Sequence, residues 1–210
     1  MLSEGYVSQC EQLYERLYRV QCVLTSAYSF YAGQYVSLYL HPHDPKPFAT
    51  YSYATPPSDL PFVEFYLRHP IPSKIGQKIY FSPPKGAMTA LDYSKEYILC
   101  AGGTGITPFL SLLKQYPDRK LRLYWSMMDA RDLLLMPKEM HRDTVICTLF
   151  DNNSDSDLYK ALEENKNLFS NETNFYLAGP IVFIDSLADF LIKKNLIKGV
   201  SQLSSDLRVF

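Results

Sequence analysis

Apolar and polar residues alternate in short segments through the first ninety or so residues of the chain. This period-two pattern is typical of strands with one buried face, and it predicts strands at 18–24, 34–40, 50–54, 62–68 and 78–81. Glycine and proline punctuate the stretches between these segments. Several short strands separated by turns indicate a small antiparallel β-barrel or sandwich.

The pattern changes at about residue 94, where apolar runs begin to alternate with segments of helical periodicity. The apolar runs predict strands at 97–101, 121–125, 145–149 and 174–178, and the periodic segments predict helices at 106–115, 131–140, 156–164 and 181–194. Strands that alternate with helices form a parallel sheet with crossover connections. We therefore expect two domains, a β domain over residues 1–93 and an α/β domain over residues 94–210.

The segment that joins the first α/β strand to its helix is rich in glycine. Residues 97–101 form an uncharged strand, which suits a position buried on both faces of a sheet. Gly102, Gly103 and Gly105 follow, and glycine allows backbone conformations and close approaches that a Cβ atom prevents. Pro108 lies early in the helix, where proline is tolerated.

A glycine turn at a helix N-terminus presents N–H groups and the positive end of the helix dipole, which suits a pyrophosphate. The dinucleotide fingerprint GxGxxG is not matched by these glycines. Spacing alone therefore leaves two interpretations open, a phosphate cradle and a tight turn without a ligand.

Composition and charge narrow the functional classes. The chain has 210 residues, is 47% hydrophobic and carries a formal net charge of −1, so nucleic acid is not an expected partner. Residues 1–15 have no long apolar core, which argues against a signal peptide. Glycine and proline interrupt the uncharged run at 97–113, so we expect no membrane span and a cytoplasmic protein.

The four cysteines are widely spaced at Cys10, Cys22, Cys100 and Cys147. This spacing does not match a CxxC redox motif or a zinc ribbon. We expect four reduced thiols and no metal site.

Several motifs in order resemble those of the ferredoxin–NADP reductase-like flavoenzymes. The string AGGTGITP at 101–108 resembles the segment that opens their pyridine-nucleotide domain, and GQYV at 33–36 resembles a strand of their flavin domain. GQKIYFSPPKG at 76–86 and NFYLAGP at 174–180 resemble two further family segments. The resemblance covers residue 18 to the C-terminus, and it implies a flavin-binding β-barrel followed by an NAD(P)-binding α/β domain.

The resemblance implies a flavin, FAD or FMN, bound at an RxYS-type motif. Thr50, Tyr51 and Ser52 match its later positions, with Tyr51 against the isoalloxazine and the Ser52 hydroxyl near its reactive edge as the catalytic pair. The motif's phosphate-binding arginine is replaced by Ala49, and only six residues, 69–74, separate Arg68 from Ile75 where the family has a phosphate-wrapping segment. Either a weakly held, dissociable flavin or an empty flavin site is therefore expected.

Positive charge for the flavin phosphate has other possible sources near the relevant strand ends. These are His41, His43, Lys46 and Arg68, and Arg68 is our candidate flavin-binding residue among them. The alternative is that the two histidines are solvated residues of a proline-rich turn. A His-x-His metal site is not indicated, because no third ligand is apparent.

The same resemblance assigns the nicotinamide nucleotide, NADH or NADPH, to the α/β domain. Its expected binding residues are Gly102, Gly103, Thr104, Gly105, Pro108, Ser126, Ala178, Gly179 and Pro180. Met127 occupies a position where many relatives have arginine, and no arginine clamp for a 2′-phosphate is evident, which favours NADH. Phe210 matches a C-terminal aromatic residue that packs near the flavin in many relatives, and the alternative is a core plug.

Together these features predict a flavin-dependent oxidoreductase that passes a hydride from NAD(P)H to FAD or FMN and electrons to an external acceptor. No iron–sulfur cysteine pattern occurs in the sequence, so the acceptor is a redox partner protein, a quinone or free flavin. Two alternatives remain open. One is an NAD(P)H:free-flavin reductase, and the other is a redox-inactive subunit that binds nucleotides or partners on the same scaffold.

Overall fold

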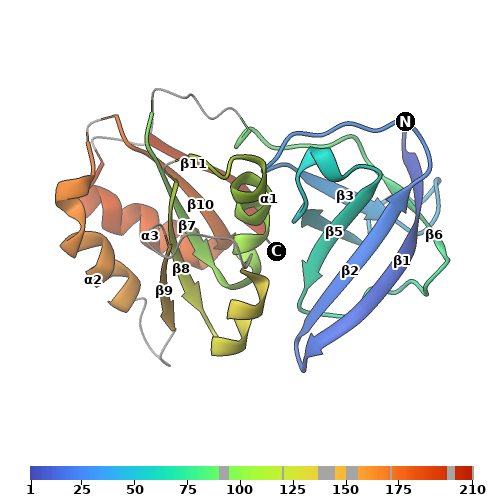
Figure 1. The fold of residues 1–210 in the computed structure, drawn as a ribbon, viewed down its shortest axis with the longest axis horizontal. Helices are drawn as coiled ribbons and strands as arrows, with labels where there is room; N and C mark the ends of the chain where they lie inside the picture. Colours follow the sequence, from blue (N-terminus) through green and yellow to red (C-terminus); the bar gives the residue numbers. More distant parts are fainter. Residues whose placement is uncertain are drawn as a thin grey trace. The chain divides into compact units, whose positions relative to one another are not determined.

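The structure is a computed structural model that describes residues 1–89, 95–119, 121–136, 145–149, 156–170, 172–197 and 202–209. Two compact units make up the chain (Figure 1). One comprises Met1–Thr89 and Thr107–Tyr116, and the other comprises Ala90–Ile106 and Pro117–Phe210. The first contains an antiparallel sheet and the second a parallel sheet with helices, which confirms the predicted fold class. The domain boundary at residues 93–94 stays a prediction.

Six antiparallel strands form the sheet of the first unit. They are β1 (Ser3–Tyr14), β2 (Leu17–Leu24), β3 (Tyr35–Tyr39), β4 (Ala49–Ser52), β5 (Phe62–Leu67) and β6 (Lys78–Phe81). Their order is β4-β3-β6-β1-β2-β5. Just beyond β4, the amide N–H of Ala54 donates to the carbonyl oxygen of Glu64 in β5 at 2.9 Å. This bond links the two outer strands of that order and closes the sheet into a barrel.

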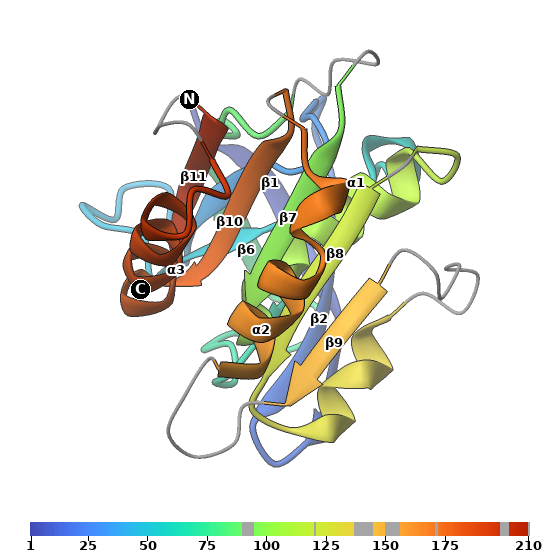
Figure 2. The same ribbon diagram turned by 90° about the vertical axis from the view of Figure 1, so that its left-hand side faces the viewer.

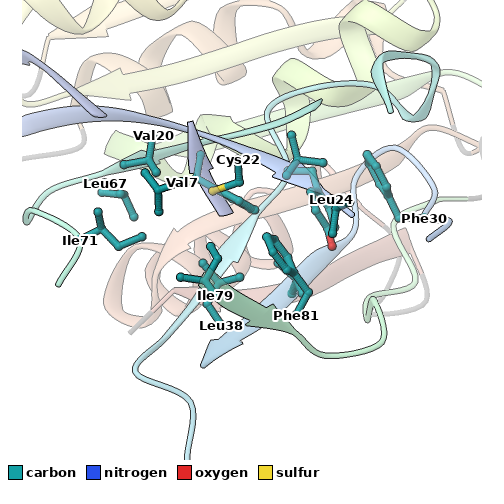
Figure 3. Packing of buried hydrophobic residues seen from close by; sticks show 14 residues of the cluster. Val7, Val20, Cys22, Leu24, Phe30, Leu38, Leu67, Ile71, Ile79 and Phe81 are labelled. Carbon is teal, nitrogen blue, oxygen red and sulfur yellow. The ribbon is translucent and has the colours of Figure 1, made fainter. Parts of the chain in front are cut away.

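Alternation along the strands fills the interior of this barrel. In β2, Val20, Cys22 and Leu24 are buried, whereas Gln21 and Val23 between them are partly exposed. Figure 3 shows these three side chains gathered with others from further strands of the sheet, including β3 and β6. Burial of one large aliphatic or aromatic side chain stabilises a fold by about 1.5–3 kcal/mol. The apolar face of each short strand therefore drives closure of the sheet.

Strand β1 is missing from the sequence prediction, which begins the barrel at residue 18. The first part of the strand alternates, with Gly5 and Val7 buried and Tyr6 exposed. Residues 9–12 are all exposed, and the ladder with β2 has irregularities after Val7 and after Gln12. A strand that is polar and exposed through its middle lacks the alternation by which strands are predicted.

Helix α1 (Thr107–Gln115) groups with the first unit. The hydroxyl of Ser111 donates to the carbonyl oxygen of Thr55 at 2.6 Å, and the Lys114 ammonium donates to that of Ala54 at 3.1 Å. Both acceptors lie shortly after β4. The helix and the segment after β4 are therefore held together by hydrogen bonds.

Five parallel strands form the sheet of the second unit. They are β7 (Tyr97–Gly102), β8 (Leu121–Met127), β9 (Val145–Leu149), β10 (Asn174–Pro180) and β11 (Leu203–Val209), in the order β11-β10-β7-β8-β9 (Figure 2). Every residue of β7 is buried, as expected for its uncharged sequence. Helices α2 (Ser156–Glu164) and α3 (Ile181–Lys193) share one core with β7, in which Leu158 and Leu187 join Cys100.

The chain reverses its direction across this sheet at β7. From β7 it proceeds to β8 and β9 on one side, and then returns to β10 on the other side of β7. The carboxyl ends of β7 and β10 are consequently neighbours, with Ala101 opposite Ala178. In open α/β sheets, ligands bind outside the carboxyl ends of the strands at such a switch point.

Two expectations for the second unit need correction. Strand β11 was not predicted, because its sequence contains Ser204, Ser205 and Asp206 and lies at the edge of the sheet order. The α-helix expected at 131–140 is wrong in its first half, where the chain forms the 3₁₀ helix η3 (Ala130–Leu135), and residues 137–140 lie outside the described residues. Met136 is extended and precedes a proline, which disfavours the helical conformation at that position. Within the described residues, further 3₁₀ helices are η1 (Pro57–Asp59), η2 (Gly103–Ile106) and η5 (Lys166–Leu168).

In the described part of the chain, no helix has both the length and the apolar character needed to cross a membrane. The same residues hold no group of three or more His, Cys, Asp or Glu side chains suited to a metal ion. Cys10, Cys22 and Cys100 are free thiols, and the Cys147 side chain lies outside the description.

Candidate functional site

The glycine turn after β7 is built from close approaches that a Cβ atom would block. Gly103 has a φ of +54°, in the left-handed region that favours glycine. A Cβ atom at Gly105 would lie 2.3 Å from the carbonyl oxygen of Ala178, and one at Gly102 would lie 2.8 Å from Cγ of Phe183. The turn is therefore seated against the end of β10 and the first turn of α3, and each glycine is required for a physical reason.

A tryptophan on the other neighbouring strand holds the same turn. Trp125 in β8 is fully buried, and its indole Nε1–H donates to the carbonyl oxygen of Gly103 at 2.8 Å. The sequence prediction missed this residue, although it is the only tryptophan in the chain. Its role depends on the strand register, which pairs it with Ala101 immediately before the turn, and that register is not visible in the sequence.

The predicted nucleotide-binding residues of the second unit come together at adjacent strand ends. Ser126, at the end of β8, is buried and lies opposite Gly102 in the ladder. Ala178 and Gly179 are buried at the end of β10, and Pro180 is exposed where α3 begins. Thr104 is partly exposed within η2. Pro108 is buried as the second residue of α1 and groups with the first unit.

The helix ends near these residues carry no acidic side chains. Among the described residues, neither η2 nor the first turn of α3 contains Asp or Glu. The residue before α3 is Pro180, which provides no side-chain cap. The first N–H groups of a helix carry positive partial charge and need an acceptor. The edge formed by β7 and β10 therefore favours a negatively charged group.

The charged residues that follow β8 bind each other. The Asp129 carboxylate accepts the amide N–H of Arg131 at 2.9 Å, and Nε of Arg131 donates to the same carboxylate at 2.9 and 3.0 Å. The positive charge of Arg131 is thus engaged within η3. Met127 is buried and offers no charge.

In the first unit, β4 carries the residues predicted to contact a flavin. Tyr51 is partly exposed and packs against the barrel core, with its ring centroid 6.2 Å from that of Phe65, and burial raises the pKa of its hydroxyl. Ser52 is buried. The hydroxyl of Thr50 lies 3.1 Å from that of Ser37. The ladder between β3 and β4 brings this motif beside the Gly-Gln-Tyr-Val segment that carries part of the resemblance.

Arg68 and His41 were predicted to supply positive charge in this unit, and each takes part in a hydrogen bond. Nη1 of Arg68 donates to the hydroxyl of Tyr14 at 2.8 Å. His41 is exposed on a turn that Asp44 stabilises, because its carboxylate accepts the His41 amide N–H at 2.8 Å. In the short connection from β5 to β6, the buried hydroxyl of Ser73 finds no hydrogen-bond partner among the described residues.

The remaining predicted site residue, Phe210, lies outside the described residues, so its place near a flavin stays a prediction.

The buried thiols are not suited to nucleophilic chemistry. Burial, and to a smaller extent Cys10, raises the pKa of Cys22 to about 12, and burial raises the pKa of Cys100 well above its ordinary range. Both remain protonated at neutral pH.

No family model matches the chain. Solved structures, however, share its fold over almost its whole length. The ferredoxin reductase in carbazole 1,9a-dioxygenase aligns with a TM-score of 0.75 and 19% identity, over 99% of this chain and 69% of that one. Phthalate dioxygenase reductase aligns with a TM-score of 0.75 and 19% identity, over 97% of this chain and 68% of that one.

A third similar structure is ferredoxin–NADP⁺ reductase from Plasmodium falciparum with 2′P-AMP. It aligns with a TM-score of 0.75 and 16% identity, over 98% of this chain and 96% of that one. The chain therefore has the fold of the ferredoxin reductase-like proteins, a β domain followed by an α/β domain.

Proposed function

We propose that this chain is an NAD(P)H-dependent flavin oxidoreductase. NADH or NADPH binds at Gly102 to Gly105, a hydride passes to FAD or FMN at Tyr51 and Ser52, and electrons leave to an external acceptor. One observation carries the proposal. The glycine turn lies at the switch point of the sheet, and its Gly105 approaches Ala178 so closely that a Cβ atom would lie 2.3 Å from the carbonyl oxygen.

The residues around this turn fit a dinucleotide pyrophosphate. Glycines permit a close approach of the backbone to the phosphates, and the neighbouring start of α3 supplies a positive dipole end without acidic side chains. Ala178 takes the position of the cysteine that many relatives place beside the nicotinamide, so the chain binds and orients the nucleotide there without a thiol. Arg131 is engaged by Asp129, which supports a preference for NADH.

The residues of β4 fit the ring of a flavin better than its phosphate. Tyr51 offers a partly exposed aromatic face whose hydroxyl stays neutral, and Ser52 offers a hydroxyl. A bound flavin would supply the hydride and electron chemistry, while the protein supplies position and electrostatics. Ala49 cannot bind a phosphate, and Arg68 already donates to Tyr14.

These missing phosphate contacts favour a second candidate, an NAD(P)H:free-flavin reductase. A charge-assisted contact contributes about 1.5–3 kcal/mol, so the loss of two weakens flavin binding by about 3–6 kcal/mol. That corresponds to about two to four decades in Kd. A flavin held so weakly leaves readily, as a substrate must.

The acceptor of the electrons is external in this proposal. One similar protein is named as the ferredoxin reductase in carbazole 1,9a-dioxygenase, and phthalate dioxygenase reductase is named for electron transfer from pyridine nucleotides to [2Fe-2S]. Both names support a redox partner protein. A quinone and free flavin are the other acceptor classes.

The visible spectrum of the purified protein tests the proposal. Yellow protein that bleaches on addition of NADH or NADPH supports a reductase with a resident flavin. Colourless protein that oxidises NAD(P)H only with added FAD or FMN supports the free-flavin reductase. Nucleotide binding without NAD(P)H oxidation would leave the redox-inactive subunit, and absence of both nucleotide and flavin binding would contradict all three.

A further inference from the structure

We propose that Trp125 is a positioning residue for nucleotide binding, because it fixes the orientation of the peptide between Gly103 and Thr104. The inference rests on the proposed nucleotide site and adds a side chain that no binding motif contains. Its basis is the hydrogen bond from the buried indole Nε1–H to the Gly103 carbonyl oxygen, at 2.8 Å.

The geometry of the peptide unit links this bond to the ligand side of the turn. A trans peptide is planar, and its carbonyl oxygen and its N–H point in opposite directions. The indole draws the Gly103 carbonyl oxygen towards β8, so the N–H of Thr104 is turned away from β8. The bond thereby sets the direction of one N–H in a segment where N–H direction determines anion binding.

The other contacts to the turn act differently. Ala178 and Phe183 limit where Gly105 and Gly102 can lie, because added Cβ atoms would collide with them. Steric limits of this kind do not by themselves set the direction of a carbonyl group, and Gly103 has the backbone freedom of glycine in the left-handed region. A hydrogen bond is directional and weakens steeply as its angle closes, so the indole adds an orientation that packing does not supply.

The neighbouring aromatic residue provides a contrast within the same strand. Tyr124 is also fully buried, and it belongs to the core formed with α2 and α3. Its hydroxyl has no hydrogen-bond partner within the described part of the chain. Strand β8 therefore tolerates a buried tyrosine hydroxyl that has no partner among the described residues. The indole N–H of the adjacent Trp125, in contrast, donates to the backbone of the glycine turn.

Substitution of Trp125 by Phe keeps an aromatic ring and removes the donor. We expect NADH and NADPH to bind about tenfold more weakly to this variant, which corresponds to about 1.4 kcal/mol. The loss should appear in the nucleotide Kd and KM, with kcat and the flavin Kd close to the wild-type values. A merely structural role would lower the melting temperature without this selective effect.

The experiment compares calorimetric titrations of wild type, Trp125→Phe and the control Tyr124→Phe with NADH, NADPH and FAD. The control removes one hydroxyl from the next residue and should leave all three affinities unchanged. Since Trp125 is the only tryptophan, biosynthetic replacement with 3-benzothienylalanine changes this position alone. That analogue keeps the shape of the indole without its N–H donor, so it tests the bond even if Trp125→Phe folds poorly.

The outcomes separate this inference from the proposed function. Weaker nucleotide binding by the benzothienyl protein, with unchanged flavin binding, supports the positioning role. Wild-type protein that binds neither NADH nor NADPH overturns both the proposed nucleotide site and the inference. Equal NADH affinity of the wild-type and benzothienyl proteins overturns the inference alone. A loss of NADH affinity in Tyr124→Phe as large as that in Trp125→Phe also overturns it.

Discussion

The glycine turn after β7 and strand β4 carry the two halves of the same proposed reaction, but they are built differently. The turn depends on backbone geometry, since Gly103 is left-handed and Gly105 approaches the carbonyl of Ala178. Strand β4 depends on side chains, of which Tyr51 and Ser52 are present and a phosphate-binding arginine is absent. Side chains can be exchanged without disturbing a ladder of backbone hydrogen bonds.

The contrast extends to the charged groups around each region. The helix ends near the glycine turn provide partial positive charge through the fold itself. The first unit would have to provide it through Arg68, which donates instead to Tyr14. The proposed nucleotide site therefore depends on the backbone, whereas the proposed flavin site depends on side chains.

Gly103→Glu has the largest expected effect, which is a loss of NADH affinity at the glycine turn. A carboxylate at this position places bulk and negative charge in the phosphate cradle, and we expect NADH affinity to fall by more than about a hundredfold, or about 2.7 kcal/mol. Flavin affinity should not change. Calorimetric titration with NADH and with FAD measures both.

Gly76→Glu is the matched control for this substitution. Gly76 also has a positive φ, of +82°, and lies in the first unit, where an added Cβ atom would have no neighbouring atom within 4 Å. This variant should lose some stability through backbone strain and keep the wild-type NADH affinity. Unchanged NADH binding by folded Gly103→Glu would refute the assignment of the turn.

Ala49→Arg tests the flavin half in the opposite direction, by restoring the missing charge. A charge-assisted contact to phosphate contributes about 1.5–3 kcal/mol, so FAD should bind about ten- to a hundredfold more tightly. Flavin fluorescence during titration reports the Kd. Ala49→Met adds a side chain of comparable reach without charge, and an equal gain in that control would show that phosphate recognition is not the cause.

Tyr51→Ala has a smaller expected effect on the same half. Removal of the aromatic face costs about 0.5–1.5 kcal/mol of ring contact, so flavin should bind about two- to tenfold more weakly. Tyr51→Phe should retain most of the affinity. NADH titration of both variants provides the comparison with the glycine turn, and a matching loss of NADH affinity would mean that the two halves do not bind independently.

The smallest expected effect is on the free energy of unfolding. It is tested by substitution of one buried tyrosine in each unit. The Tyr53 hydroxyl lies 2.5 Å from that of Tyr28, so Tyr53→Phe should lower the free energy of unfolding by about 1 kcal/mol. Tyr124→Phe removes a hydroxyl that lacks a partner in the described residues, and it should leave stability unchanged or raise it. Urea denaturation measures both, and a larger loss for Tyr124→Phe would contradict this comparison.

The sequence predicts most of the fold because strand and helix periods are local properties. It finds β2 to β10 within a few residues, but not β1 and β11, whose exposed or polar residues hide the strand pattern. The three glycines are likewise visible in the sequence. The bond from Trp125 to Gly103 is not visible, because it depends on the register between β7 and β8.

The residues proposed to bind the flavin show the same limit of prediction from sequence. The replacement of arginine by Ala49 can be read directly from the sequence, whereas the engagement of Arg68 by Tyr14 depends on how distant strands assemble. Sequence therefore identifies which groups are present, and the fold determines which of them are already bound to a partner.

Calorimetric titration of flavin-free protein with NADH and NADPH tests the central claim most directly. The account predicts saturable binding of one nucleotide per chain, because the glycine turn is shaped by β7, β8, β10 and α3 without any contribution from a flavin. Absence of binding by either nucleotide to folded protein would contradict it.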